Sequence, residues 1–433
     1  MSDLTELIRT LWRKLLSAVT TWNYNPARGW LDNKRYADNT GPSYTYKPSG
    51  RLQTRVWART PAITTTYSYN AAGDLQGMDY SDTTADVAMT YDRAGRPKTI
   101  TDGSGTRALV YDPSGQLKDE DYTAGLLDTL GVHRSFDSLA RLDSVSVPSV
   151  YSVGYTYDAA SRLDTVTSGA NTATYSYVSN SPLIGGVVFK QAGATRLTTI
   201  KAYDNLNRLS SISSAPLGAP EPPGGGGSAV SAAYAYNNAN QRTRVTREDN
   251  AYWQYEYDAL GQVIVGRKHL PTDAIINGLD FGWRFDDIGN RRTATVNAQL
   301  STYSANSLNQ YSSRTVPGMI DVMGAAQTDA TVTVTFPASG GNVLPTLRQG
   351  ELYARQLTVD NGTAAQYASV KVTGVKNFVG PNGEDAVTEE TRRVLVTGTP
   401  EVFTHDADGN LTDDARWHYT WDGGQLKGSG FNV

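Results

Sequence analysis

The chain has 433 residues, with 39 Lys or Arg against 43 Asp or Glu and a net charge of −4. No basic excess or Lys/Arg block is present, so we expect no nucleic-acid partner. The absence of cysteine excludes a disulfide scaffold, a thiolate metal site and a cysteine nucleophile. No run of about 20 apolar residues occurs, which predicts that no helix spans a membrane. The 41 glycines, and 26 tyrosines against 8 phenylalanines, favour a turn-rich β-protein.

Residues 1–20 carry the one clear helical pattern. Apolar residues from Leu4 to Val19 recur at spacings of three and four, the period of an amphipathic helix. Asp3 and Glu6 suit a capping box at its start. The order of acidic, basic and apolar residues differs from that of a signal peptide. We expect a helix that packs on the body of the protein or begins a shortened chain; the alternative is an anchor at an anionic lipid surface.

From Tyr24 onward the chain repeats one short pattern: an aromatic residue, Asp or Asn, a turn closed mostly by Gly, then Leu or Val. The aromatic positions 46, 69, 91, 111, 136 and 157 lie 20 to 25 residues apart. Self-similarity at this period is typical of a repeat architecture. Clear copies occupy residues 69–75, 91–97, 111–117, 136–142, 157–163, 203–209, 257–263, 285–290 and 405–411, and weaker copies begin at Tyr46, Tyr236 and Trp421.

Each copy is interpreted as a β-hairpin. The residues before the turn alternate, so that Tyr67 and Tyr69 share one face of a strand. The Asp or Asn folds its side chain back onto the backbone as an Asx-turn, and Gly, or Asn207 in one copy, supplies the positive φ. Because one hairpin is unstable alone, neighbours are expected to pair edge to edge into a long twisted sheet. Most tyrosines should then pack against neighbouring repeats with their hydroxyls hydrogen-bonded.

Two segments interrupt the copies and define the predicted organisation. Residues 216–228 are rich in Pro and Gly and are predicted to be a surface loop between two strands. Residues 316–400 lose the Tyr-Asp pattern but contain four short strand-like runs, which predict a small inserted β-sandwich. Its role is either a structural decoration of the wall or ligand and glycan binding. The prediction is an all-β chain: an amphipathic helix over 1–20, a curled antiparallel array of repeat hairpins over 21–315, the insertion, and final hairpins over 401–433.

The search for catalytic motifs finds no nucleophile elbow, zinc-protease helix, Walker loop or dinucleotide fingerprint. We therefore predict no catalytic, cofactor-binding or metal-binding residue, no cofactor, and no enzyme activity. His405 takes the aromatic position of its copy and should be a packed ring, with His418 nearby. Residues 406–414 superficially resemble a calcium loop, but Gly409 is fourth rather than sixth and Trp417 stands twelfth, where an EF-hand needs Glu. A hydrolase with dispersed carboxylates, or a self-cleaving protease, stays open as an alternative.

The copies over residues 22–315 and 401–426 resemble the YD-repeat family, the Rhs proteins of bacteria and their animal relatives, the teneurins. The resemblance implies a β-sheet spiral that curls into a large hollow shell. In bacterial relatives the shell encloses a C-terminal toxin, and in teneurins it is part of a cell-surface adhesion receptor. It also implies an extracellular or cell-surface location, and repeats that are mostly non-catalytic and sometimes bind carbohydrate.

The chain departs from the family pattern after the repeats. Family members usually carry a core with Asp-Pro and Gly-Arg-Trp signatures, whereas the only Asp-Pro pair here, Asp112-Pro113, lies in an ordinary repeat turn. We therefore expect a truncated, non-catalytic segment of an Rhs-type shell without the C-terminal core and toxin. Its partners would be the remainder of the shell or its toxin cargo. The alternative is a carbohydrate- or cell-surface-binding module that uses exposed tyrosines or the inserted sandwich. Open sheet edges also predict edge-to-edge self-association.

Overall fold

The computed structural model describes residues 20–36, 38–217, 229–337, 340–422 and 425–431. The described residues form strands and turns and contain no α-helix. Twenty-seven strands, β1–β26 and β34, belong to one antiparallel sheet that does not close. The predicted all-β class and curled antiparallel sheet are thereby confirmed. The helix predicted over residues 1–20 falls almost wholly outside the described residues.

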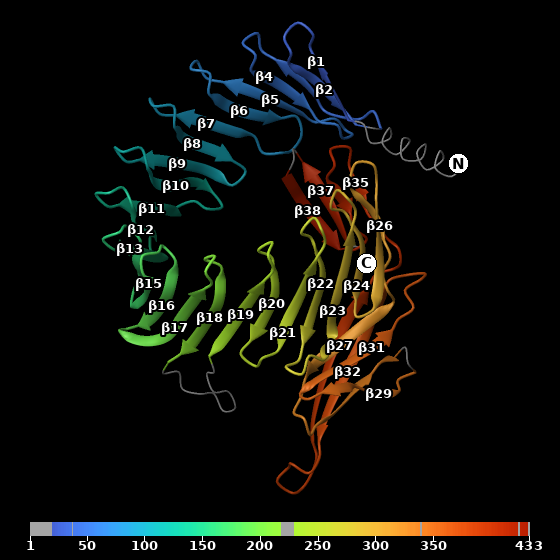
Figure 1. The fold of residues 1–433 in the computed structure, drawn as a ribbon. Coiled ribbons are helices and arrows are strands. Elements are labelled where there is room, and N and C mark those ends of the chain that lie inside the picture. The colour runs from blue at the N-terminus through green and yellow to red at the C-terminus, as the bar shows by residue number, and fades with distance from the viewer. Residues whose placement is uncertain (1–19, 37, 218–228, 338–339, 423–424, 432–433) are drawn as a thin grey trace. The chain divides into compact units, whose positions relative to one another are not determined.

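The chain divides into two compact units, called here the N-terminal unit (residues 20–234 with 422–425) and the C-terminal unit (residues 235–421 with 426–433). Within each unit, consecutive hairpins lie side by side and the sheet twists along its length (Figure 1). The strands of the N-terminal unit are β1 (Thr21–Tyr24), β2 (Leu31–Arg35), β3 (Ser43–Tyr46), β4 (Leu52–Val56), β5 (Thr64–Tyr69), β6 (Leu75–Tyr80), β7 (Val87–Tyr91), β8 (Pro97–Asp102), β9 (Gly105–Tyr111), β10 (Leu117–Gly125), β11 (Gly131–Phe136), β12 (Leu142–Val147), β13 (Tyr151–Tyr157), β14 (Leu163–Ser168), β15 (Asn171–Tyr177), β16 (Ile184–Gln191), β17 (Ala194–Tyr203) and β18 (Leu209–Pro216), followed by β19 (Val230–Tyr236).

The array continues in the C-terminal unit with the same hairpin plan. Its strands are β20 (Arg242–Arg247), β21 (Tyr252–Tyr257), β22 (Val263–His269), β23 (Ile275–Phe285), β24 (Arg291–Val296), β25 (Gln299–Ala305) and β26 (Tyr311–Arg314). A loop is predicted over 216–228, but the structure places Pro216 at the end of β18. Residues 218–228 lie outside the described residues.

The register of the repeat hairpins places the aromatic residue opposite the aliphatic residue that follows the turn. In the β13–β14 hairpin Thr156 pairs with Thr165, and after an irregularity Tyr157 pairs with Leu163. The hydroxyls of the two threonines lie 2.6 Å apart. The hairpins closed at Tyr46, Tyr69, Tyr91, Tyr203 and Tyr257 have the same irregularity at the aromatic residue. This register confirms the expected meeting of aromatic and aliphatic positions across the strands.

The array buries few apolar side chains, among them Ile63, Val187, Ala232 and Ala294. A single sheet layer has no second layer to pack against, so its apolar groups stay half-buried. Hydrogen bonds and side-chain contacts between consecutive hairpins are therefore the interactions that fasten the array together.

The largest apolar core lies in the insertion, where two small sheets contribute to one cluster. Ile320 and Leu357 come from the three-stranded sheet, and Val334, Val370 and Val396 come from the four-stranded sheet. The first sheet contains β27 (Met319–Ala325), β30 (Leu347–Gln349) and β31 (Leu352–Thr358), and the second contains β28 (Thr331–Thr335), β29 (Val343–Pro345), β32 (Gln366–Lys376) and β33 (Ala386–Val396).

The insertion is joined to the array at two places. The amide of Asn297 donates to Asp321 at 2.7 Å, and the Gln349 side chain bonds the backbone of β23 at Ile275 and Asn277, at 2.9 and 2.8 Å. After the insertion the chain returns through β34 (Glu401–Val402), which pairs with β26. The last strands form a separate sheet: β35 (Thr404–His405), β36 (Leu411–Asp413), β37 (Trp417–Asp422) and β38 (Gln425–Phe431).

Candidate functional site

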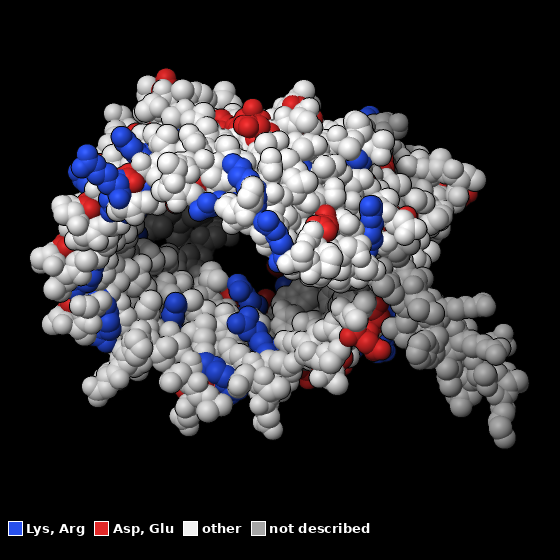
Figure 2. All heavy atoms as spheres, turned by 90° about the horizontal axis from the view of Figure 1, so that it is seen from above, with Lys and Arg blue, Asp and Glu red and all other residues white. Residues whose placement is uncertain are grey.

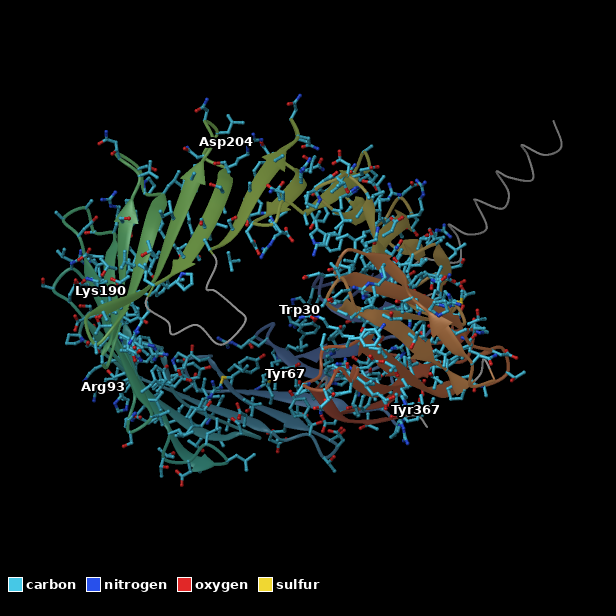
Figure 3. The ribbon with its side chains drawn as sticks, turned by 90° about the horizontal axis from the view of Figure 1, so that it is seen from below. Trp30, Tyr67, Arg93, Lys190, Asp204 and Tyr367 are labelled. Carbon is cyan, nitrogen blue, oxygen red and sulfur yellow. The ribbon has the colours of Figure 1, made fainter. Side chains whose placement is uncertain are left out.

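Most repeat turns are built around the carboxylate or amide that follows the aromatic residue. In the β13–β14 turn, Oδ1 of Asp158 accepts the backbone N–H groups of Ala160 and Arg162, both at 2.9 Å. Its Oδ2 accepts Nε of Arg162 at 2.8 Å. The predicted Asx-turn is confirmed, and the arginine four residues after the Asp adds a charged clamp. Figure 3 shows an equivalent residue, Asp204, at the tip of the β17–β18 hairpin.

The tyrosine of each copy reaches back to the preceding hairpin. The Tyr157 hydroxyl donates to the carbonyl of Leu142 at 2.8 Å, and the Tyr177 hydroxyl donates to that of Leu163 at 2.6 Å. In both cases the acceptor is the residue five positions after the Asp of the turn. The same bond is made by Tyr69 to Leu52, Tyr91 to Leu75, Tyr111 to Pro97, Tyr203 to Ile184 and Tyr257 to Arg242. This confirms the expectation that the repeat tyrosines pack on neighbouring repeats with bonded hydroxyls.

The clamping arginine also contacts the next repeat. The guanidinium of Arg162 lies 4.2 Å from the ring centre of Tyr177, and its Nη1 donates to the carbonyl of Ser181 at 2.8 Å. Arg96 and Tyr111 are related in the same way, at 4.3 Å. We call this set of Asp clamps, cation–π contacts and tyrosine hydroxyl bonds the tyrosine–arginine ladder. It joins each hairpin to the next through side chains, in addition to the backbone hydrogen bonds of the sheet.

Two turn carboxylates of the ladder, Asp92 and Asp158, are stabilised in the ionised form. Hydrogen bonds from the backbone N–H and the guanidinium of Arg162 lower the pKa of Asp158 below its ordinary value of 3.8. The same two donors of Arg96 lower the pKa of Asp92. A carboxylate that accepts several N–H bonds is stabilised in its charged form. These carboxylates are therefore suited to holding the turn at neutral pH rather than to transferring a proton.

The turns need a left-handed residue three positions after the Asp. Gly95 and Asn207 fill it with φ of 76° and 61°, as the sequence predicted. Ala140 and Ser161 fill it in two other copies with φ of 62° and 60°, although a Cβ atom disfavours this conformation. The register of the array therefore imposes the turn even where the local sequence does not favour it.

A buried carboxylate marks the point where the array, the insertion and the last hairpins meet. Glu401 is 1% exposed and forms an ion pair with Arg314 of β26. Thr397, at the end of the insertion, donates to it at 2.5 Å, and Arg416 donates at 3.0 Å. Burial alone would raise the pKa of Glu401, but hydrogen bonds from Arg314 and Thr397 lower it below 4.5. We call these four residues the Glu401 junction.

Near the Glu401 junction, a joint of the array lacks both the clamping arginine and the aromatic ring of the ladder. Asn290 stands where the clamping arginine is expected, and Ala305 stands where the next tyrosine is expected. A cavity of about 420 Å³ opens there. Tyr303, two residues before the missing ring, lies on its wall, and burial would raise the pKa of this phenol, but hydrogen bonds from Arg314 and Arg291 lower it.

Four aromatic rings form a row across β21 and β23. Trp253 stacks with Tyr255 at 6.3 Å and with Phe281 at 6.0 Å, and Phe281 stacks with Trp283 at 6.2 Å. Gly266 of β22 lies between these strands, paired with Tyr255 on one side and Phe281 on the other. A Cβ atom at Gly266 would lie 3.5 Å from the Trp283 ring, an ordinary van der Waals contact, so the ring passes close over the strand between β21 and β23.

The histidines and the acidic C-terminal turn take structural positions. His405 is half-buried, and burial lowers its pKa. In the turn that resembles a calcium loop, Asp406 accepts the backbone N–H groups of Asp408 and Asn410 at 3.0 and 2.9 Å and the Asn410 amide at 2.9 Å. This is the ordinary repeat turn. Across the part of the chain that the structure describes, no group of three or more His, Asp or Glu is placed to hold a metal ion.

The charges on the surface are mixed rather than segregated. Figure 2 shows Lys and Arg side chains interspersed with Asp and Glu on the face in view. Many of the basic groups are committed to ion pairs, among them Arg96 with Asp92 and Arg141 with Asp137, both at 2.7 Å. No helix of the described residues is long and apolar enough to cross a membrane.

The sequence reasoning found the turns and the tyrosines but missed three features. Arg162 bridges two hairpins through its contact with Tyr177, and only the register of the sheet brings that ring close to the arginine. The Glu401 junction gathers residues from separate segments and has no local pattern. The irregular joint did leave a signal, because the copy that ends at Ala305 lacks its aromatic residue.

Comparison with known proteins gives structural similarities only. No protein-family model and no curated protein matches the sequence. The chain is similar to a crystal structure of TcdB2-TccC3-Cdc42, with 11% identity and a TM-score of 0.42, over 95% of this chain and 31% of that chain. It is also similar to a mutated Photorhabdus luminescens Tc holotoxin pore, with 12% identity and a TM-score of 0.43, over 95% of this chain and 24% of that chain. The chain thus spans less than a third of the length of either.

Proposed function

We propose that the chain is a non-catalytic wall segment of an Rhs-type shell that encloses a toxin or another polypeptide cargo. The tyrosine–arginine ladder is the observation that carries the proposal. Its repeated side chains join one hairpin to the next. The Asp accepts hydrogen bonds within its own turn, and the arginine contacts the tyrosine of the next hairpin. That tyrosine in turn donates to the backbone of the preceding hairpin. Such an arrangement extends a single sheet layer without needing a second layer.

The absence of catalysis in this proposal rests on how the polar groups are used. The carboxylates of the turns, such as Asp158, are ionised and hydrogen-bonded by their own turn, and Glu401 is enclosed by its partners. A general acid needs a raised pKa and access to substrate, and neither carboxylate has both. Intact-mass measurement of the purified chain should give the full-length mass; fragments from self-cleavage would contradict this part of the proposal.

Protection of a polypeptide tests the enclosing role. A protease-sensitive, unstructured reporter would be joined to the C-terminus through a flexible linker and digested with trypsin. A wall segment is expected to lengthen the half-life of the joined reporter relative to the same reporter added as a separate chain. A variant with a weakened ladder, Tyr157→Ala with Tyr177→Ala, should lose part of that protection. Equal half-lives for joined and separate reporter would contradict the enclosing role.

The aromatic row supports carbohydrate binding as a second candidate function. The rings of Trp253, Phe281 and Trp283 lie within one face of the array, and the apolar face of a sugar ring stacks on aromatic rings. An oligosaccharide panel measured by calorimetry tests this. If the row binds glycans, Trp283→Ala should abolish the affinity and Tyr367→Ala, an exposed aromatic of the insertion, should leave it unchanged. No affinity for any member of the panel, or loss only with Tyr367→Ala, would contradict the row as the site.

A further inference from the structure

The cavity at the irregular joint is a consequence of two missing ladder side chains. At an intact joint, Arg141 clamps Asp137, stacks on Tyr157 and donates to the Ser161 hydroxyl at 3.0 Å. The corresponding ladder positions at the irregular joint are held by Asn290 and Ala305. Because a guanidinium and a phenol are both absent there, the space that they fill elsewhere stays open. The cavity of about 420 Å³ is lined by Asp286, Ile288, Asn290, Arg291, Arg292, Tyr303, Ala305, Asn306, Ser307 and Asn309.

The turns around this cavity keep their usual shape. Asp286 accepts the backbone N–H of Asn290 at 2.8 Å and the Asn290 amide at 3.0 Å. Asn306 accepts the backbone N–H of Gln310 at 3.0 Å. Asn290 also contacts Asn309 across the joint, as Arg141 contacts Ser161 at an intact one. The cavity is therefore a defined gap between two ordinary repeat turns rather than a place where the array is distorted.

Tyr311 lies next to the gap but is not part of its lining. Ala305 pairs with Tyr311 of β26, and the Tyr311 hydroxyl accepts the backbone N–H of Arg291 at 2.7 Å. Its ring lies 5.4 Å from that of Tyr303 at a tilt of 56°. The lining thus contains one aromatic ring, that of Tyr303, and two exposed residues, Ala305 and Ile288, the latter 73% exposed.

The charges of the lining select an uncharged aromatic guest over a cation. Asp286 is the one acidic residue of the lining, against Arg291 and Arg292, so another guanidinium would meet a net positive wall. Arg292 lies 3.7 Å from Asp286, with 63% of its side chain exposed, and Arg291 lies 5.5 Å from the Tyr303 ring centre. Both arginines belong to the lining that an incoming ring would meet, and the amide nitrogen of Asn309 can donate to a phenol hydroxyl.

We propose that this cavity is a docking slot for a tyrosine side chain supplied by a polypeptide partner, which takes the place of the ring missing at Ala305. The slot lets an extended peptide supply a ring at a joint where Asn290 replaces the clamping arginine and Ala305 replaces the aromatic residue. The proposal depends on the geometry of this joint and holds whether or not the chain encloses cargo.

Binding of short peptides to the full chain tests the slot. The probe is a blocked pentapeptide with one tyrosine between glycine pairs, followed by ligand-observed nuclear magnetic resonance, with the corresponding arginine and alanine peptides and methyl α-glucoside as comparisons. The tyrosine peptide should bind saturably and at least tenfold more tightly than the others. No saturable binding of the tyrosine peptide, or equal or tighter binding of the arginine peptide or the glucoside, would overturn the proposal.

Variants locate the binding. Ala305→Tyr restores the missing ring and should abolish peptide binding while raising the melting temperature. Asn290→Arg restores the clamping arginine and should also block the slot. This second variant serves as the test if Ala305→Tyr folds poorly. Tyr157→Ala opens a matched gap at an intact joint and should create a second binding site with a loss of stability. Unchanged affinity in folded Ala305→Tyr and in Asn290→Arg would place the peptide elsewhere and overturn the proposal.

Discussion

The guanidinium of Arg141 lies 4.5 Å from the ring centre of Tyr157, one hairpin further along the chain. The same guanidinium holds Asp137 through Nε at 2.7 Å, and the Tyr157 hydroxyl returns to Leu142, next to Arg141. One side chain therefore fixes its own turn and positions the ring of the next repeat. The same relationship links Arg96 to Tyr111 and Arg162 to Tyr177, so the strength of the array depends on contacts between neighbouring hairpins, as expected for repeat proteins.

A double-mutant cycle on Arg141→Ala and Tyr157→Leu should give a coupling free energy of about 0.5–1 kcal/mol, the range of a partly exposed cation–π contact. Urea unfolding followed by circular dichroism provides the four free energies of unfolding. The matched control pairs Arg141→Ala with Tyr203→Leu, two joints away, and should be additive to within about 0.5 kcal/mol. Equal coupling in the two cycles would show that the Arg141–Tyr157 contact contributes nothing specific.

Glycine at the strained turn positions should stabilise the protein. Ala140 has φ of 62°, a conformation that costs a residue with a Cβ atom about 1 kcal/mol. Glycine removes that cost, although it also adds entropy to the unfolded chain. Ala140→Gly is therefore expected to raise the free energy of unfolding by about 0.5 kcal/mol. Ala94→Gly, at a turn position of a copy that already has Gly95, is the control and should not stabilise; a gain there equal to that of Ala140→Gly would contradict the explanation.

The array should lose stability in acid. The pKa values of Asp92, Asp137 and Asp158 are lowered below 3.8 by hydrogen bonds in their turns. A carboxyl whose pKa is lower in the folded state stabilises the fold above its unfolded pKa, and this contribution is lost as the pH falls through the folded pKa. The melting temperature should therefore fall as the pH is taken from 3.8 downward.

The Asp158→Asn variant is the control for the acid prediction. Asn keeps the Asx-turn, as Asn70 does in its own copy by accepting the backbone N–H of Asp74 at 2.9 Å, but it has no charge to lose. Its melting temperature should depend less on pH in the acid range than that of the unaltered protein. An identical pH dependence would mean that the ladder carboxylates do not set the acid stability.

Glu401→Gln should be among the most destabilising conservative substitutions in the C-terminal unit. It leaves Arg314 and Arg416 without their carboxylate in a place where Glu401 is 1% exposed. Removing one member of a buried ion pair costs about 3 kcal/mol. Thermal unfolding measures this loss, and Glu390→Gln, in an exposed pair with Arg392, is the control that should change little. A loss no larger than that of the control would contradict a joining role for the Glu401 junction.

The sequence predicted the parts of the fold that repeat locally. The Asx-turn at Asp158 and the pairing of Tyr157 with Leu163 follow from residues less than ten positions apart, where turn chemistry and alternation act directly. Arg162 was visible in the copy, but its second partner, Tyr177, lies in the next hairpin. Its bridging role therefore depends on the sheet register, which the pattern of one copy does not contain.

Contacts between distant segments were beyond sequence reasoning for a physical reason. Glu401 is held by Arg314 from before the insertion and by Arg416 from after it, and no periodicity links these positions. The loss of the aromatic residue at Ala305 is plain in the sequence, but the cavity there is lined by residues of two separate turns, 286–292 and 303–309. Side-chain packing between the two turns decides the size of the cavity, and the repeat pattern does not.

The central claim is that the chain is a wall segment built from one open sheet, and small-angle scattering coupled to absolute mass tests it most directly. A compact globule of 433 residues would have a radius of gyration of about 22 Å. The account predicts that the monomeric fraction has a radius of gyration clearly above that value. A monomer at about 22 Å would mean that the hairpins pack on themselves and would contradict the wall-segment function.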